Sequence, residues 1–83
     1  MDAFESRIIA VVADELGIPE SEVTPASRFA DDFGVDEFGI AGLALRLGDE
    51  LDADVALSHE DVEAVESVGD LIDAVRRLAP QTI

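Results

Sequence analysis

Apolar residues recur every three or four positions along most of this chain, and this period limits its fold more than any other feature of the sequence. The first apolar stripe ends at Leu16, where Gly17 and Pro19 predict the end of an α-helix. Asp2 and Glu5 have the spacing of a helix N-cap and the acidic residue that completes a capping box. No segment alternates apolar and polar residues over a useful length, so the sequence predicts an all-α fold. The stripe consists of Phe4, Ile8, Val11, Val12 and Leu16.

Three further segments begin with good helix caps. Asp36 is an N-cap residue at the start of a predicted helix over 36–51. Ser58 and Ser67 are each followed three positions later by an aspartate, which predicts a short helix over 59–64 and a last helix after Ser67. The inner stripe of the helix over 36–51 is Ile40, Leu43, Ala44, Leu47 and Leu51. The inner stripe of the last helix is Val68, Leu71, Ile72, Val75 and Leu78.

Residues 17–35 form a long connection between the first two predicted helices. A structureless loop of this length is uncommon in a compact domain, so we expect apolar side chains to hold it across the core. Because the chain has neither a linker-like segment nor a repeat, we expect a single domain over 1–83. It would have four helices, the third of them short, and a long first loop. The side chains expected to hold the loop are Ile18, Val23, Phe29 and Phe33.

The charge balance narrows the choice of partners. Twenty Asp and Glu residues face five Arg and no Lys, which gives a formal net charge of −15. Nucleic-acid phosphates and anionic lipids would repel such a chain, whereas a basic protein surface would attract it. An alternative is that the acidic residues only keep the domain soluble. No apolar stretch approaches the roughly 18 residues that span a bilayer, and no secretory signal is present, so a cytoplasmic protein is expected.

Aromatic, acidic and glycine residues follow one another in a distinctive order over residues 29–38. The segment reads Phe29, Ala30, Asp31, Asp32, Phe33, Gly34, Val35, Asp36, Glu37 and Phe38, and Leu43, Leu47 and Leu51 come after it. This pattern resembles the acyl carrier protein family, whose second helix opens with an aromatic-x-acid-acid-apolar-Gly-x-Asp-Ser-Leu segment. The resemblance covers about residues 4–78. It implies a four-helix carrier bundle with a long first loop and a short third helix.

The resemblance also implies 4′-phosphopantetheine as cofactor, attached to the serine that follows the aspartate of this segment. Here the residue after Asp36 is Glu37. A carboxylate that attacked the pyrophosphate of coenzyme A would give a mixed anhydride, which water cleaves, so we expect no cofactor to be attached. Glu37 either imitates the missing phosphate or is an acid of the kind favoured in a first helical turn. The serines better explained as helix, loop or cap residues are Ser6, Ser21, Ser27, Ser58 and Ser67.

The predicted helix over 36–51 has an unusual outer surface. Its outward positions are Gly39, Gly42, Arg46 and Asp49, where the family resemblance implies acids that engage partner enzymes. Glycine is unfavourable inside a helix, so we interpret these glycines as allowing a partner or a second copy to pack closely, with drift as the alternative. Phe38, Ala41 and Leu45 form a second apolar stripe. For Phe38 taken alone, a place in the core is the simpler expectation.

We therefore expect a non-catalytic module that binds or regulates an enzyme of acyl or polyketide metabolism through a basic patch on that enzyme. A homodimer through the helix over 36–51 is a further expectation. The alternatives are a genuine acyl or aminoacyl carrier modified at another side chain, and a relative that binds a free lipid. A single histidine, His59, and no cysteine predict neither a metal site nor a catalytic triad. The predicted partner-binding residues are Asp36, Glu37, Phe38, Gly39, Ala41, Gly42, Leu45, Arg46, Glu60 and Asp61.

Overall fold

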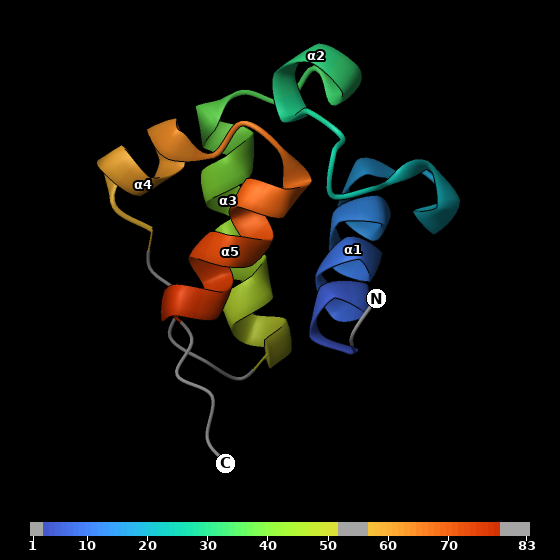
Figure 1. Ribbon diagram of the computed structural model, residues 1–83, viewed down its shortest axis with the longest axis horizontal. Helices are drawn as coiled ribbons and strands as arrows, with labels where there is room; N and C mark the ends of the chain where they lie inside the picture. The colour runs from blue at the N-terminus through green and yellow to red at the C-terminus, as the bar shows by residue number, and fades with distance from the viewer. Residues whose placement is uncertain (1–2, 52–56, 79–83) are drawn as a thin grey trace.

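The chain forms helices where the sequence predicts them. The computed structural model describes residues 3–51 and 57–78, and within these ranges it contains no β-strand. In Figure 1 α5 is drawn in front of α3, and α1 lies beside them, while α2 and α4 lie at the end of the bundle where α3 begins. The predicted N-cap Asp2 lies outside the described residues. In chain order the elements are α1 (Ala3–Leu16), the 3₁₀-helix η1 (Glu20–Glu22), α2 (Phe29–Phe33), α3 (Glu37–Leu51), α4 (His59–Ala64) and α5 (Val68–Leu78).

The end of α1 follows the sequence prediction in detail. Gly17 adopts the left-handed conformation with φ 69°. Its N–H donates to the carbonyl of Asp14 at 3.2 Å, and the N–H of Ile18 donates to the carbonyl of Ala13 at 3.0 Å. These two bonds form a Schellman motif, which satisfies carbonyls that the helix end would otherwise leave unpaired.

The first connection contains more structure than the sequence predicted. The expectation of four helices omitted η1 and the five-residue α2. An isolated helix this short is unstable, so tertiary contacts must hold α2 in place. Phe29 is buried and packs edge-on against Phe33 with ring centroids 6.4 Å apart. Gly34, with φ 66°, ends the helix, and the N–H of Val35 donates to the carbonyl of Phe29 at 2.8 Å.

Backbone hydrogen bonds fasten this connection to the segment before α5. The N–H of Phe29 donates to the carbonyl of Glu66 at 3.0 Å, and the N–H of Val68 donates to the carbonyl of Ser27 at 2.9 Å. The N–H of Gly69 also donates to the carbonyl of Pro25 at 2.9 Å. The two segments are far apart in sequence, so these bonds explain how the connection is ordered across the top of the bundle.

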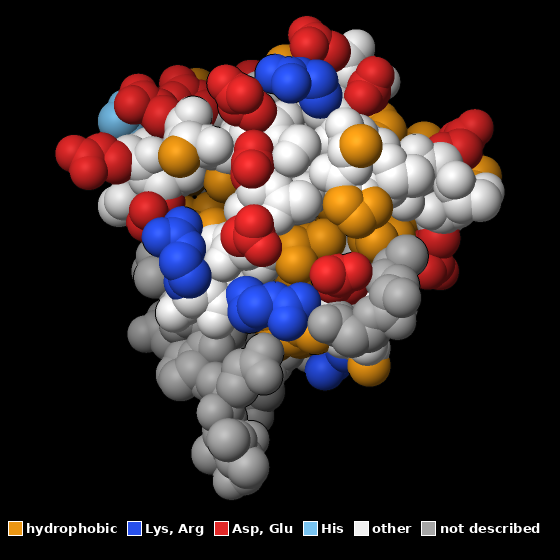
Figure 2. Space-filling model, viewed as in Figure 1, with side chains coloured by type: hydrophobic (Ala, Val, Ile, Leu, Met, Phe, Trp, Pro, Cys, Tyr) orange, Lys and Arg blue, Asp and Glu red, His pale blue; other side chains and the backbone are white. Residues whose placement is uncertain are grey.

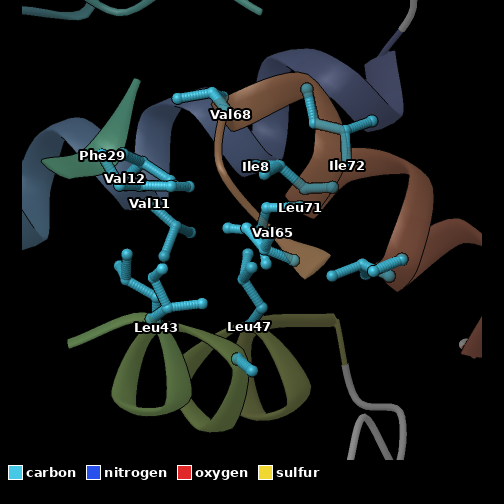
Figure 3. Packing of buried hydrophobic residues seen from close by; sticks show 14 of the residues in the cluster. Ile8, Val11, Val12, Phe29, Leu43, Leu47, Val65, Val68, Leu71 and Ile72 are labelled. Carbon is cyan, nitrogen blue, oxygen red and sulfur yellow. The ribbon is translucent and has the colours of Figure 1, made fainter. Parts of the chain in front are cut away.

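The core lies between α1, α3 and α5, whose inner side chains point toward one another in Figure 3. The described residues of the stripes predicted for these helices are buried or pack at the edge of the cluster. The four side chains expected to hold the loop are also buried or pack at its edge. The side chain of Leu78 lies outside the described part. Five buried residues were not predicted: Ile9, Ala13, Val62, Val65 and Ala74.

Capping boxes begin both α4 and α5. In α4, Ser58 Oγ accepts from the N–H of Asp61 at 3.2 Å, and Asp61 Oδ2 accepts from the N–H of Ser58 at 3.2 Å. In α5, Ser67 Oγ accepts from the N–H of Asp70 at 3.2 Å. Asp70 Oδ2 accepts from the N–H groups of Glu66 and Ser67, each at 3.1 Å, and these bonds lower the pKa of the Asp70 carboxyl.

Candidate functional site

The start of α3 presents an acidic side chain at one end of the bundle. Asp36 caps the helix as predicted, because its Oδ1 accepts a hydrogen bond from the N–H of Gly39 at 2.9 Å. Glu37 is the first residue of α3 and is exposed. Unpaired N–H groups and the helix dipole favour negative charge at this position. The sequence thus places a carboxylate where a helix end stabilises it.

Two surface clefts meet at Glu37. One of about 270 Å³ lies between α2, α3 and the end of α4, and the other, of about 250 Å³, lies between α3 and α4. The charged lining of the first comprises Arg28, Asp31, Asp36, Glu37, Glu63 and Glu66. The second is lined by Glu37, Phe38, Ala41, Leu57, His59 and Val62.

The short helix α4 brings two polar side chains toward Glu37. His59 and Glu63 are one turn apart, and His59 Nε2 lies 2.9 Å from Glu63 Oε1. One ligand atom from each of Glu37, His59 and Glu63 lies within 4.8 Å of the other two, and all three residues are exposed. The junction of α3 and α4 therefore gathers two carboxylates and an imidazole on the surface.

The predicted second apolar stripe of α3 faces outward. Phe38 is 79% exposed and Leu45 is 70% exposed, while Ala41 between them packs against the edge of the core. The expectation that Phe38 on its own belongs to the core is therefore wrong. Ile40, two residues later in α3, is buried in the inner stripe as predicted.

The two glycines on the outer surface of α3 have different surroundings. A Cβ atom on Gly39 would lie 2.6 Å from Val35 Cγ1, so a side chain of the same molecule occupies the space that this glycine leaves. A Cβ atom on Gly42 would meet nothing within 4 Å. Both glycines line a groove of about 380 Å³ between α3 and the end of α1. Only Gly42 thus has the open surface that close packing of another chain requires.

Arg46 is turned toward α1 rather than outward, contrary to its predicted position on a free surface. Its guanidinium forms ion pairs with Asp14 and, at 3.1 Å, with Glu15, and its side chain is 29% exposed. The hydrogen bond to Asp14 raises the pKa of the guanidinium above its ordinary value. Arg46 therefore joins α3 to α1 through these ion pairs and does not present a free cation on the outer surface of α3.

The predicted contact residues of α4 also differ from each other. Glu60 is exposed. Asp61 is partly buried and its carboxylate is held by the capping box with Ser58. Glu60 is thus available to a partner, whereas Asp61 serves first to begin the helix.

Acidic side chains dominate the end of the molecule around this site. Figure 2 shows them gathered along the edge formed by α4 and α2. The ion pairs of Arg28 with Asp31 and with Glu66, both at 3.2 Å, neutralise only part of this charge. Within the described ranges, no helix is both long enough and apolar enough to pass through a membrane.

A family model described as the phosphopantetheine attachment site matches residues 6–75. The chain belongs to this phosphopantetheine-binding family of acyl carrier proteins. The solved solution structure of the apo doublet acyl carrier protein from prodigiosin biosynthesis has the same fold, with a TM-score of 0.74 at 20% identity. The match covers 94% of the present carrier domain, which spans only 37% of that chain.

The family match overturns one expectation. We expected the chain to carry no cofactor, but the family it belongs to is that of phosphopantetheine attachment, and this prosthetic group is therefore implied for the carrier domain. Glu37 does not itself fit the group, because a carboxylate forms no stable phosphodiester. Two hydroxyls of the carrier domain cap helices, those of Ser58 and Ser67.

Sequence reasoning predicted Glu60 and Asp61 of α4 as partner-binding residues, but it missed the approach of His59 and Glu63 to Glu37. It assigned His59 to neither a metal site nor a catalytic triad, and it did not single out Glu63. The spacing of four residues between them was a usable signal, since it places both on one face of a helix. Their approach to Glu37 depends on how α3 packs against α4, which no local pattern encodes.

Proposed function

We propose that this carrier domain acts as a non-catalytic interaction module, which binds a basic surface on an enzyme of acyl or polyketide metabolism through α3 and α4. The observation that carries the proposal is the pair of exposed side chains Phe38 and Leu45 on one stripe of α3. Single apolar residues on a surface are ordinary. A stripe with an exposed aromatic residue at one end, beside a cleft, is the kind of surface that a partner covers.

Charge around the stripe supports a basic partner. Glu37 precedes Phe38 at the start of α3, and Glu60 is exposed on the neighbouring α4. The chain as a whole has a formal charge of −15. A partner with a basic patch around an apolar pocket would be attracted over a distance and then held by Phe38. Binding should accordingly weaken as the salt concentration rises.

A photo-crosslinking side chain at position 38 tests this proposal in extracts of the native host. We expect it to capture an acyl- or polyketide-metabolism enzyme, and Phe38→Ala should weaken binding of that purified enzyme at least tenfold. The matched control places the same crosslinker at Asp73, which is exposed on α5. Capture of the same proteins from both positions, or unchanged affinity of Phe38→Ala, would refute the proposal.

A second candidate function is carriage of an acyl or aminoacyl group in the family's usual manner, and the family match favours it. Because position 37 is a glutamate, the group would then be attached to a serine hydroxyl elsewhere in the chain. Ser6 and Ser21 are exposed candidates. Incubation with coenzyme A and a broad-specificity phosphopantetheinyl transferase, followed by intact-mass measurement, tests it. A gain of one phosphopantetheinyl unit supports carriage, and peptide mapping identifies the residue.

We also propose that two copies of the chain can associate through α3. The open surface at Gly42 and the groove beside it would accept a second copy. Sedimentation velocity over a range of protein concentrations distinguishes the two cases. Self-association is supported if the chain sediments as a dimer and Gly42→Glu disrupts this dimer with helicity unchanged. If the chain is a monomer at all concentrations, self-association through α3 is refuted and the enzyme is the proposed partner that stays.

A further inference from the structure

Three side chains that commonly bind metals converge where α3 meets α4. Glu37 lies in the first turn of α3, and His59 and Glu63 lie one turn apart on α4. One ligand atom of each lies within 4.8 Å of the other two. The group contains an imidazole nitrogen and two carboxylates contributed by two different helices, so it is more than a run of acidic residues.

The dimensions of this group suit a single small dication. Zinc binds histidine nitrogen and carboxylate oxygen at about 2.0–2.2 Å, so two of its ligand atoms in a tetrahedral site lie about 3.4 Å apart. Side-chain rotations of an ångström or so bring ligand atoms that lie within 4.8 Å of one another to this spacing. All three side chains are exposed, and exposed side chains change rotamer readily.

The backbone holds the three residues in a fixed relation. The Ser58–Asp61 capping box fixes the start of α4 next to His59. The Asp36 cap fixes the start of α3 next to Glu37. Val62, between the two ligand residues of α4, is buried in the core and sets which face of α4 is turned outward. Metal binding therefore requires little ordering of the main chain.

We propose that Glu37, His59 and Glu63 form a binding site for one transition-metal dication of the Zn²⁺ type. Imidazole with carboxylate suits zinc and its neighbours, whereas magnesium and calcium prefer oxygen ligands alone. Three protein ligands leave a fourth position open in a tetrahedral zinc site. Glu37 and His59 both line the cleft of about 250 Å³ between α3 and α4, so a water or a small ligand can occupy that position from the cleft.

Isothermal titration of the whole chain with Zn²⁺ alone tests the proposal, with Mg²⁺ titrated in parallel. We expect one site per chain and an affinity for Zn²⁺ at least tenfold above that for Mg²⁺. His59→Gln, Glu37→Gln and Glu63→Gln should each weaken Zn²⁺ binding at least tenfold. The matched control is Glu60→Gln, which removes the same charge from the same helix next to His59 and should change the affinity less than twofold.

A second measurement uses the fact that His59 is the single histidine of the chain. Its ring proton resonances are therefore identified without assignment, and they should shift or broaden until one equivalent of Zn²⁺ has been added. Unchanged ring resonances overturn the proposal. It is equally overturned if Glu60→Gln weakens binding as much as Glu63→Gln, because Zn²⁺ would then be a counterion of the acidic surface. The circular dichroism of each variant verifies its helicity.

Discussion

The guanidinium of Arg46 on α3 lies 3.1 Å from the carboxylate of Glu15 in the last turn of α1. It also pairs with Asp14 one residue earlier. Both carboxylates lie in the last turn of α1, where the negative end of the helix dipole disfavours acidic side chains. With only five arginines against twenty acidic residues, a cation at this point relieves repulsion that the sequence would otherwise concentrate there. Arg46 thus stabilises the packing of α3 on α1.

Replacing Arg46 with glutamine should lower the thermal midpoint of unfolding, because it leaves Asp14 and Glu15 without their shared cation. The loss should be largest at low salt and should shrink as added salt screens the charges. Arg77→Gln, at an exposed position in the last turn of α5, is the charge-matched control and should lower the midpoint less. Equal losses for the two variants would show that net charge matters and the contact with α1 does not.

Two glycines of the site region should respond in opposite ways to alanine. Gly34 has φ 66°, where a Cβ is strained, so Gly34→Ala should lower the free energy of unfolding by about 1–2 kcal/mol. Gly42 lies within α3 with open space around its Cα, so Gly42→Ala should raise the free energy of unfolding by about 0.5–1 kcal/mol. Urea denaturation measures both. A loss of stability in Gly42→Ala would contradict the open surface found there.

A pair of leucines on α3 separates stability from recognition. Leu47 is completely buried and Leu45 is 70% exposed. Leu47→Ala should lower the free energy of unfolding by about 2–5 kcal/mol, as for other leucines removed from a packed core. Leu45→Ala should change it by no more than about 0.5 kcal/mol. If Leu45 belongs to the docking surface, its variant should weaken partner binding with the urea midpoint unchanged.

Much of the fold could be predicted because the signals for it are local. Gly17 after an apolar stripe, and serine followed by aspartate three residues later, each specify a helix end through hydrogen bonds within a few residues. The short α2 could not be predicted in this way, because bonds such as that from Phe29 to the carbonyl of Glu66 hold it from outside. Val62 and Val65 were likewise missed, since their burial depends on how α4 packs.

The candidate site was predicted less well, and for a similar reason. The sequence placed Phe38, Ala41 and Leu45 on one stripe, and periodicity alone was sufficient for that. It could not tell that Arg46 turns toward α1, because the position of a long side chain depends on the charges of another helix. The approach of His59 to Glu37 is a consequence of helix packing across a gap of more than twenty residues.

The capping carboxylate of Asp70 predicts a specific dependence of stability on pH. The hydrogen bond from the N–H of Glu66, with further bonds from Ser67, lowers the pKa of Asp70 in the folded state. A pKa lowered on folding stabilises the protein above the unfolded value of about 3.9, and this contribution is lost as the pH falls through the folded pKa. The stability difference between wild type and Asp70→Asn should therefore be constant near neutral pH and should shrink in acid. Urea titrations at a series of pH values measure this difference, with Asp73→Asn on the exposed face of α5 as the control for lost charge. A deficit of Asp70→Asn that persists undiminished at the lowest pH would mean that the ionised carboxylate does not supply the stabilisation.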